Sequence, residues 1–232
     1  MEIQLYYTER GEGEPLVLLH GNGGNCGYFK HQLEHFSKEY HVIAVDTRGH
    51  GRSPRGTKPF TLKQFAKDLK AFLDEKKLKR VNLLGFSDGG NIALIFALKY
   101  PSYVKRLILN GANLYPSGLK LRYQAEEYVD FIRLLIRGKD EKSRGEATRL
   151  ELMKIMIEEP HIRVEALHKL RMPVLVIAGT DDMIRTGHTR RIYRSILNGQ
   201  LALIEGDHFI AAKNPDGFNE AVENFLKTFV GF

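Results

Sequence analysis

The sequence of 232 residues has no tryptophan and a single cysteine, Cys26. One cysteine excludes a disulfide within the chain and fits a reducing compartment. No apolar run approaches the roughly 20 residues that a membrane-spanning helix needs. The opening MEIQLYYTERGEGEP lacks the basic start and the continuous apolar stretch of a secretory signal. We therefore expect a cytoplasmic protein with no membrane partner.

Acidic residues are fewer than basic ones, with 28 Asp and Glu against 35 Lys and Arg, for a formal net charge of +7. The basic residues gather in DEKKLKR at 74–80 and RTGHTRRIYR at 185–194. Neither segment interleaves aromatic residues or matches a motif that reads nucleic acid. We expect no nucleic-acid partner, and the sequence leaves the oligomeric state open.

Apolar runs rich in Val, Ile and Leu recur along the chain and predict buried strands separated by helices. Runs without apolar and polar alternation are typical of a mostly parallel sheet covered on both faces. The strands are expected at 16–20, 41–46, 81–85, 106–111, 174–179 and 201–206. The helices are expected at 28–39, 61–77, 89–100, 187–197 and 216–229. An extra strand is expected in EIQLYY at 2–7, before a turn-like segment.

One interval between predicted strands is far longer than a simple connection. The segment 113–171 contains three helix-like stretches and no linker rich in Pro, Gly or Ser. We predict a short helical cap at 113–171, inserted into one α/β core domain formed by 1–112 and 172–232.

A serine between glycines stands at the end of the strand predicted at 81–85, in the sequence LLGFSDGG. Gly85, Ser87 and Gly89 match the pattern G-x-S-x-G, which is a weak signal by itself. The setting is stronger, because a strand-like run precedes the serine and a helix-like run follows it. Glycines on both sides let the backbone turn sharply and present the hydroxyl at the carboxyl edge of the sheet.

Two later strand ends carry the groups that such a serine needs. A serine hydroxyl is a poor nucleophile, so a histidine must accept its proton and an acid must orient that histidine. VLVIAGTDDMI ends a strand in Asp181 and Asp182, and LALIEGDHFI ends the next one before His208. His208 is the favoured base because it lies in a loop between a strand and a C-terminal helix. Either aspartate is a candidate acid.

The glycine-rich LVLLHGNGGN offers backbone donors for a developing oxyanion. It follows a predicted strand directly, so it can aim the amide of Asn22, with Gly23 beside it, at the same point as the amide of Asp88. We predict the oxyanion hole from Asn22 and Asp88.

In these features the chain resembles the α/β-hydrolases, a superfamily of esterases, lipases and carbon–carbon hydrolases. The resemblance covers essentially the whole chain except the cap. It is carried by His20-Gly21, VDTRGHGRS at 45–53, the turn around Ser87, KYPSYVKRLILNGA at 99–112, Asp182 after AGT, and His208 before Phe209. It implies the α/β-hydrolase fold. It also implies an acid three residues after Gly179, which points to Asp182 and leaves Asp181 as the runner-up.

Other reactive side chains have simpler explanations. We expect His20 to order the glycine loop, His50 to lie in a turn and His188 to lie on a surface helix. Cys26 has no matching base, so buried packing is favoured. The His and Asp residues lack the spacing of metal ligands, and we expect no metal and no cofactor.

The substrate pocket is expected outside the carboxyl ends of the strands and under the cap. Its candidate lining residues are Gly23, Phe86, Asn113, Phe131 and Leu135. Asp88 departs from the uncharged residue that often follows the serine in the family. A carboxylate in the first turn of a helix is favoured by the helix dipole, and we hypothesise that it also disfavours anionic acyl groups.

The sequence thus predicts a serine hydrolase that cleaves small to medium-sized carboxylic esters through an acyl-enzyme on Ser87. His208 is the expected base, and Asp182 is expected to orient His208. The same triad can serve carbon–carbon bond hydrolysis, lyase or thioester chemistry, and the same fold can act as a ligand receptor. The physiological substrate stays open.

Overall fold

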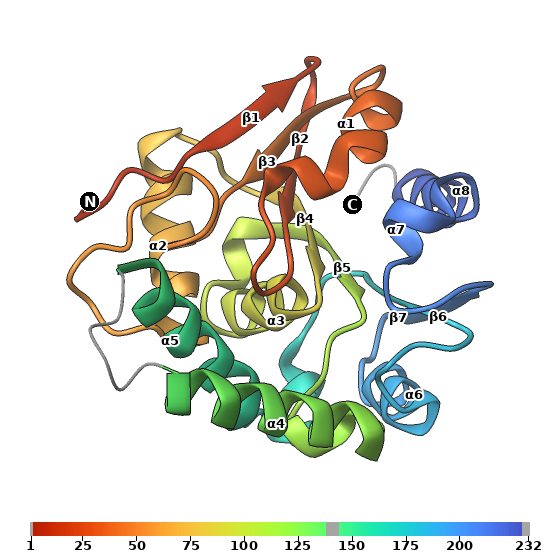
Figure 1. Cartoon of the computed structure of the whole chain (residues 1–232). Coiled ribbons are helices and arrows are strands. Elements are labelled where there is room, and N and C mark those ends of the chain that lie inside the picture. Colours follow the sequence, from red (N-terminus) through yellow and green to blue (C-terminus); the bar gives the residue numbers. More distant parts are fainter. Residues whose placement is uncertain (1, 138–143, 229–232) are drawn as a thin grey trace.

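The computed structural model describes residues 2–137 and 144–228, and its centre is a sheet of seven strands in the order β1-β3-β2-β4-β5-β6-β7 (Figure 1). The strands are β1 (Tyr7–Arg10), β2 (Glu14–Leu19), β3 (Tyr40–Val45), β4 (Val81–Phe86), β5 (Val104–Asn110), β6 (Val174–Gly179) and β7 (Gly199–Ile204). All neighbours pair in parallel except β1, which runs antiparallel to β3. The predicted mostly parallel sheet is confirmed.

Helices cover both faces of the sheet (Figure 1). The first face is covered by α2 (Leu62–Glu75), α3 (Asp88–Lys99) and α6 (Thr186–Arg194), and the second by α1 (Lys30–Phe36), α7 (Ile210–Lys213) and α8 (Pro215–Thr228). Strand β2 shows why its sequence is apolar throughout. Val17 and Leu19 pack into the core of the first face, Leu16 and Leu18 into that of the second. A strand buried on both sides has no polar alternation.

The opening strand differs from the prediction. It begins at Tyr7 and ends at Arg10, inside the part expected to be a turn, and residues 2–6 are not in a strand. Its position is decided by backbone pairing with β3, in which Tyr7 lies opposite Val45. The buried Ile3 instead packs in the hydrophobic core of the first face.

The chain order creates a switch point between β2 and β4. After β2 the chain moves outward to β3 and then returns across β2 to β4. Crevices outside the carboxyl ends of strands at such a point are the usual ligand sites of open α/β sheets. The loop after Leu19 and the turn at Ser87 both follow these two strand ends.

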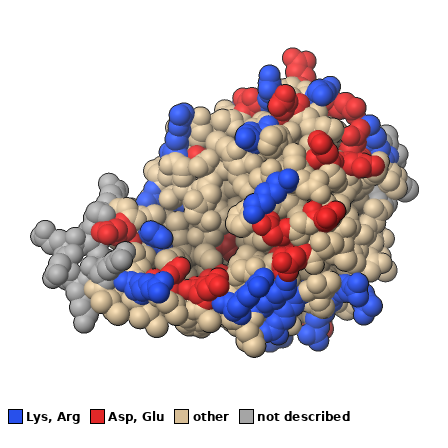
Figure 2. Space-filling model, turned by 45° about the vertical axis from the view of Figure 1, so that its right-hand side comes forward, with Lys and Arg blue, Asp and Glu red and all other residues tan. Residues whose placement is uncertain are grey.

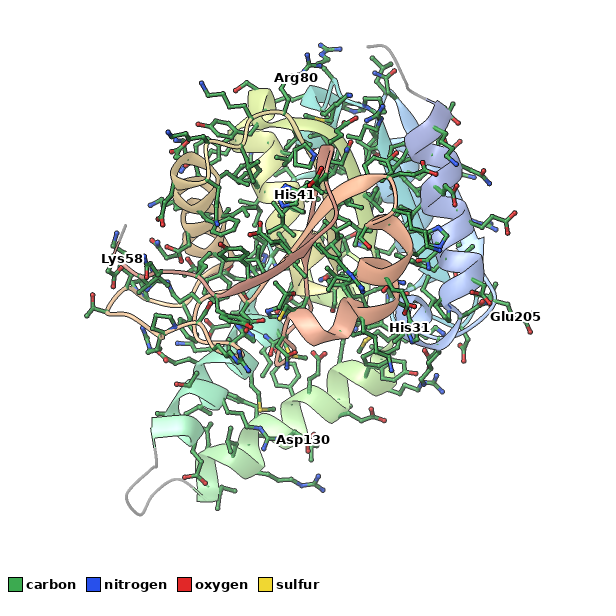
Figure 3. The ribbon with its side chains drawn as sticks, turned by 90° about the horizontal axis from the view of Figure 1, so that it is seen from above. His31, His41, Lys58, Arg80, Asp130 and Glu205 are labelled. Carbon is green, nitrogen blue, oxygen red and sulfur yellow. The ribbon has the colours of Figure 1, made fainter. Side chains whose placement is uncertain are left out.

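The long interval between β5 and β6 contains α4 (Leu121–Arg137) and α5 (Arg144–Glu158), which lie together at one end of the molecule (Figure 1). The third predicted helix is a 3-10 segment, Val164–Lys169. Arg80, directly before β4, and Asp130, on α4, lie at opposite ends of the molecule (Figure 3). Strand β4 therefore points toward α4. The division into a core domain and a cap at 113–171 stays a prediction.

Across the described ranges, every helix is too short or too polar to span a bilayer.

Candidate active site

Ser87 occupies a strained turn between β4 and α3. Its φ of 53° and ψ of −122° lie in a region that residues other than glycine rarely adopt. Its backbone N–H donates to the carbonyl of Asn110, 2.8 Å away, which ties the turn to the end of β5. A Cβ on Gly85 would lie 2.1 Å from the Gly89 carbonyl oxygen. A side chain therefore does not fit at Gly85, and the turn requires the glycine that the sequence places there.

His208 follows β7 and is held by Asp182, which follows β6. His208 Nδ1 lies 2.7 Å from Asp182 Oδ1, and these residues are only 5% and 3% exposed. The same Asp182 oxygen accepts the backbone N–H of Ile184 at 2.8 Å, which fixes the carboxylate. Within the described part of the chain, His208 Nε2 is buried and has no hydrogen-bond partner. The imidazole is thus oriented on one side and open for a reacting group on the other.

The segment Asn110–Gly111 brings this imidazole and the serine turn together. Asn110 accepts the Ser87 amide, and a Cβ on the next residue, Gly111, would lie 2.6 Å from His208 Cε1. Gly111 also has a φ of +60°, a conformation that other residues rarely adopt. The ring of Phe86 lies 4.8 Å from the ring of His208 between centroids. Three distant loops therefore converge at the end of β5.

Asp181 points away from this cluster. Its side chain is 72% exposed and pairs with Lys120 Nζ at 2.7 Å, which lowers the pKa of the Asp181 carboxyl. The geometry around His208 thus favours Asp182 as the acid.

The loop after β2 lies against the serine turn. A Cβ on Gly21 would be 3.1 Å from Ser87 Cβ, so the two backbones approach closely. His20 orders this loop, because its Nδ1 donates to the Gly21 carbonyl at 2.7 Å while its Nε2 accepts the Thr47 amide at 3.1 Å. Burial lowers the pKa of His20, which favours this neutral form. The amides of Asn22 and Asp88 remain the candidate oxyanion donors.

Side-chain amides surround the carboxylate of Asp88. Asn22 Nδ2 donates to Asp88 Oδ2 at 2.8 Å and to the Leu152 carbonyl of α5 at 2.9 Å. Asn91 Nδ2 lies 3.4 Å from Asp88 Oδ1 and donates to Asn113 Oδ1 at 2.9 Å. Burial raises the pKa of the Asp88 carboxyl, while the bonds from these amides lower it. The side-chain oxygen of Asn113 is therefore already hydrogen-bonded to Asn91 of α3.

The other predicted lining residues lie in different places. Phe86 is buried and stacks on Tyr28, with ring centroids 4.5 Å apart. Its ring therefore packs between Tyr28 and His208. Phe131 lies half-buried on α4, whereas Leu135 is 39% exposed on the outer side of that helix, and its predicted pocket role loses support. Gly23 is exposed and, with Asn22, borders a cavity of about 760 Å³ between its loop and α5.

The remaining candidates pack as structural groups. His50 is buried in its turn, and burial lowers its pKa to about 4. Cys26 is buried, and its amide donates to Asp46 Oδ1. His188 lies on α6 as expected but is only 7% exposed, because its Nε2 accepts the Leu114 amide at 2.9 Å. Over residues 2–137 and 144–228, no group of three His, Cys, Asp or Glu side chains is arranged to hold a metal ion.

Two residues that bear on the later argument were missed by the sequence reasoning. Gly111 follows a strand like many loop glycines, and only its contact with His208 distinguishes it. Glu127 lies half-buried on α4, and burial together with the charge of Asp88 raises its pKa to about 7. An acid within an apolar helical pattern was the available signal for Glu127.

Comparisons with known proteins agree with this architecture. A family model described as alpha/beta hydrolase fold matches residues 14–155. The human protein named serine hydrolase BPHL is 29% identical, with 97% of this chain and 84% of that protein covered. The 3-oxoadipate enol-lactonase 2 of Acinetobacter baylyi is 24% identical, with 98% and 95% covered. The structure of a thermophilic esterase from Thermogutta terrifontis matches with a TM-score of 0.82 at 24% identity, with 97% and 94% covered.

Proposed function

Because this chain belongs to the alpha/beta hydrolase family, we propose that it is a serine hydrolase that cleaves small to medium-sized carboxylic esters through an acyl-enzyme on Ser87. The observation that carries the proposal is the imidazole of His208. It is bound to Asp182 at Nδ1, and its buried Nε2 has no partner among the described residues, beside a strained serine turn.

In the proposed first step, Ser87 Oγ attacks the ester carbonyl carbon while His208 Nε2 takes the hydroxyl proton. Asp182 holds the imidazole so that Nδ1 carries its proton and stabilises the imidazolium. The carbonyl oxygen becomes an oxyanion, which the backbone amides of Asn22 and Asp88 receive. The C–O bond then breaks, and His208 returns the proton to the leaving alcohol.

The second half repeats these roles with water. His208 Nε2 takes a proton from a water molecule that attacks the acyl-enzyme, and the same amides receive the oxyanion. The proton passes to Ser87 Oγ as the acid leaves. These steps need only the chain, the ester and water. The segment 113–171 is proposed to act as the cap that covers the substrate, with Phe131 facing inward.

The first test measures hydrolysis of short p-nitrophenyl esters by the protein and by Ser87→Ala. We expect the variant to lose at least about 10³-fold in kcat, as removal of a triad member does in serine hydrolases. A fluorophosphonate probe should label Ser87 alone, as mapped by mass spectrometry. Full turnover by a clean preparation of the variant would overturn the assignment.

A panel of substrates separates the alternatives. Relatives and similar structures are named as a lactonase, an esterase and an enzyme that degrades N-acyl homoserine lactones, so the panel should add lactones to open-chain esters, diketones and acyl thioesters. We expect the highest kcat/KM for an ester or lactone. A diketone or thioester as the best substrate would assign the triad to the carbon–carbon or thioester chemistry. Tight binding of a ligand with negligible turnover would indicate a receptor.

A further inference from the structure

Helix α4 presents one acidic side chain inward. Its half-buried residues form a stripe with helical spacing, Tyr123, Gln124, Glu127, Phe131 and Leu134. Of the five charged residues of α4 whose side chains the structure describes, only Glu127 is not exposed. Its neighbour Glu126 carries the same charge on the solvent side of the helix. Glu127 therefore lies on the side of α4 that faces the rest of the protein.

The charge of Glu127 is not neutralised by the surrounding protein. Among the described residues, no hydrogen bond or ion pair involves its carboxylate, which is a costly state for a half-buried acid. Burial is the main cause that raises the pKa of Glu127 to about 7, and the negative charge of Asp88 is the other. Helix α4 packs against α5, and the Leu152 carbonyl of α5 accepts Asn22 Nδ2, the same group that donates to Asp88 Oδ2. The inward stripe of α4 therefore lies on the side of the molecule that carries Asp88, the residue after Ser87, which agrees with the contribution of the Asp88 charge to the pKa of Glu127.

Asp88 is held in place by neutral groups. Its oxygens are approached by the side-chain amides of Asn22 and Asn91, at 2.8 and 3.4 Å, and no ion pair joins it to a described cation. Amide donors orient the carboxylate without adding a positive charge, and a protonated His208 is the group that would offset part of its negative charge. The space-filling view shows acidic atoms at the floor of a hollow in the face presented (Figure 2). Under the proposed cap, a substrate bound at Ser87 would lie next to Asp88 and on the side of α4 that carries Glu127.

We propose that Glu127 is a specificity-determining residue of this site, which acts with Asp88 to reject substrates that carry a negative charge in the acyl chain. The proposal rests on the proposed ester hydrolysis and adds the charge class of the substrate to it. Like charges a few ångströms apart in a partly buried site repel strongly enough to change a rate several-fold. Glu127 selects through this repulsion and takes no part in bond making.

The test compares two esters that differ by one terminal charge. The p-nitrophenyl ester of pentanoic acid and the p-nitrophenyl hemiester of glutaric acid have acyl chains of the same carbon number, but the second ends in a carboxylate. The measured quantity is the ratio of kcat/KM for the anionic ester to kcat/KM for the neutral ester, at pH 8, where Glu127 with its pKa of about 7 is mostly ionised. The variants are Glu127→Gln, which keeps the side-chain shape, and Glu127→Met, which keeps its length without polarity. Glu126→Gln is the matched control, because it removes the same charge from the outer side of α4.

We expect Glu127→Gln and Glu127→Met to raise this ratio by about three- to tenfold, whereas Glu126→Gln leaves it within about twofold. Added salt should raise the ratio of the unchanged protein and should have less effect on Glu127→Gln, since only a charge effect is screened. A merely structural role for Glu127 would lower both rates together and leave the ratio unmoved.

Equal ratios in all three variants and the unchanged protein would overturn the inference while leaving ester hydrolysis intact. Failure of the unchanged protein to hydrolyse the neutral ester would instead remove the proposed function. Should Glu127→Gln fold poorly, Glu127→Met and the salt dependence of the unchanged protein still decide the question.

Discussion

The loops at the carboxyl edge of the sheet and the inserted helices α4 and α5 hold their side chains in different ways. At the sheet edge, His20, Asp182 and His208 are 1%, 3% and 5% exposed, and each is bound by backbone or side-chain groups from another loop. On α4, large apolar side chains face solvent, with Leu121 at 73% and Ile136 at 64% exposed. The sheet edge is thus packed on all sides, whereas α4 is packed on one.

The inserted helices are joined to the core mainly through α5 and its end. Arg55 donates two hydrogen bonds to the carboxylate of Glu151 on α5. Arg55 Nε lies 2.9 Å from Glu151 Oε2, and the second bond joins the Arg55 guanidinium to Glu151 Oε1. The Leu152 carbonyl accepts Asn22, and Glu159 accepts the Leu62 amide at 2.9 Å. We infer from this difference that the closely packed carboxyl edge of the sheet performs the chemistry, whereas the less tightly held helices α4 and α5 select the substrate. Changes at the edge should then lower turnover of every ester, while changes in the helices should alter KM or preference.

The largest expected effect is that of Asp182→Asn, which leaves the imidazole without its oriented acceptor. We expect kcat for neutral and anionic esters alike to fall by about 10³- to 10⁴-fold. Asp181→Asn is the control, since that side chain faces Lys120, and its kcat should stay within about twofold. Steady-state kinetics on the two variants decide the matter, and a larger loss for Asp181→Asn would reverse the assignment of the acid.

Gly111→Ala should have the next largest effect. The added methyl would press on His208 and strain a positive φ, so we expect kcat to fall by about 10- to 100-fold with little change in the ratio between esters. The matched control is Gly187→Ala on α6, where a Cβ meets no atom within 4 Å. An unaltered kcat for Gly111→Ala in a folded protein would show that the imidazole is not confined by this backbone.

Breaking the link between Arg55 and Glu151 should act on substrate binding. We expect Glu151→Gln to raise KM for p-nitrophenyl esters about two- to fivefold and to change kcat little, because α5 loses an ionic contact with the core. Glu158→Gln, which loses only its exposed pair with Lys154, serves as control. A drop in kcat with KM unchanged would contradict the division between edge and helices.

The smallest expected effect is the dependence of stability on pH through Glu127. Its pKa is raised from 4.5 to about 7, so the folded protein holds more protons than the unfolded chain between these values. This group therefore lowers stability as pH rises through that window, by about 1 kcal/mol after allowance for its partial exposure. Urea unfolding at pH 5 and pH 8 should show a smaller fall for Glu127→Gln than for Glu126→Gln. Identical falls in the two variants would show that Glu127 is not desolvated.

The sheet and the serine turn could be predicted because their signals are local. A strand buried on both faces is a continuous apolar run, and the turn at Ser87 needs glycines at fixed positions beside it. The register of β1 could not be predicted in the same way, because its backbone bonds to β3 leave no mark on the side chains. His188 was expected on a surface helix, and its burial depends on Leu114, 74 residues away in sequence.

Helix α4 shows a further limit. Its residue Leu135 was expected to line the pocket, yet it is 39% exposed, and the apolar Tyr128 and Ile132, at helical spacing from it, are 52% and 51% exposed. The stripe that contains Glu127 faces inward instead. Periodicity identifies the faces of a helix, but it does not state which face meets the rest of the protein.

The sequence by itself determined the parallel sheet, the sharp turn that carries Ser87 and the order of the candidate acid and base, because these depend on apolar runs and on glycines adjacent in the chain. Tertiary structure alone decided that Asp182 and not Asp181 holds His208, that Gly111 lies against the imidazole and that Glu127 lies on the inner side of α4. Each of these depends on side chains from segments distant in sequence, whose meeting is set by packing of the whole fold.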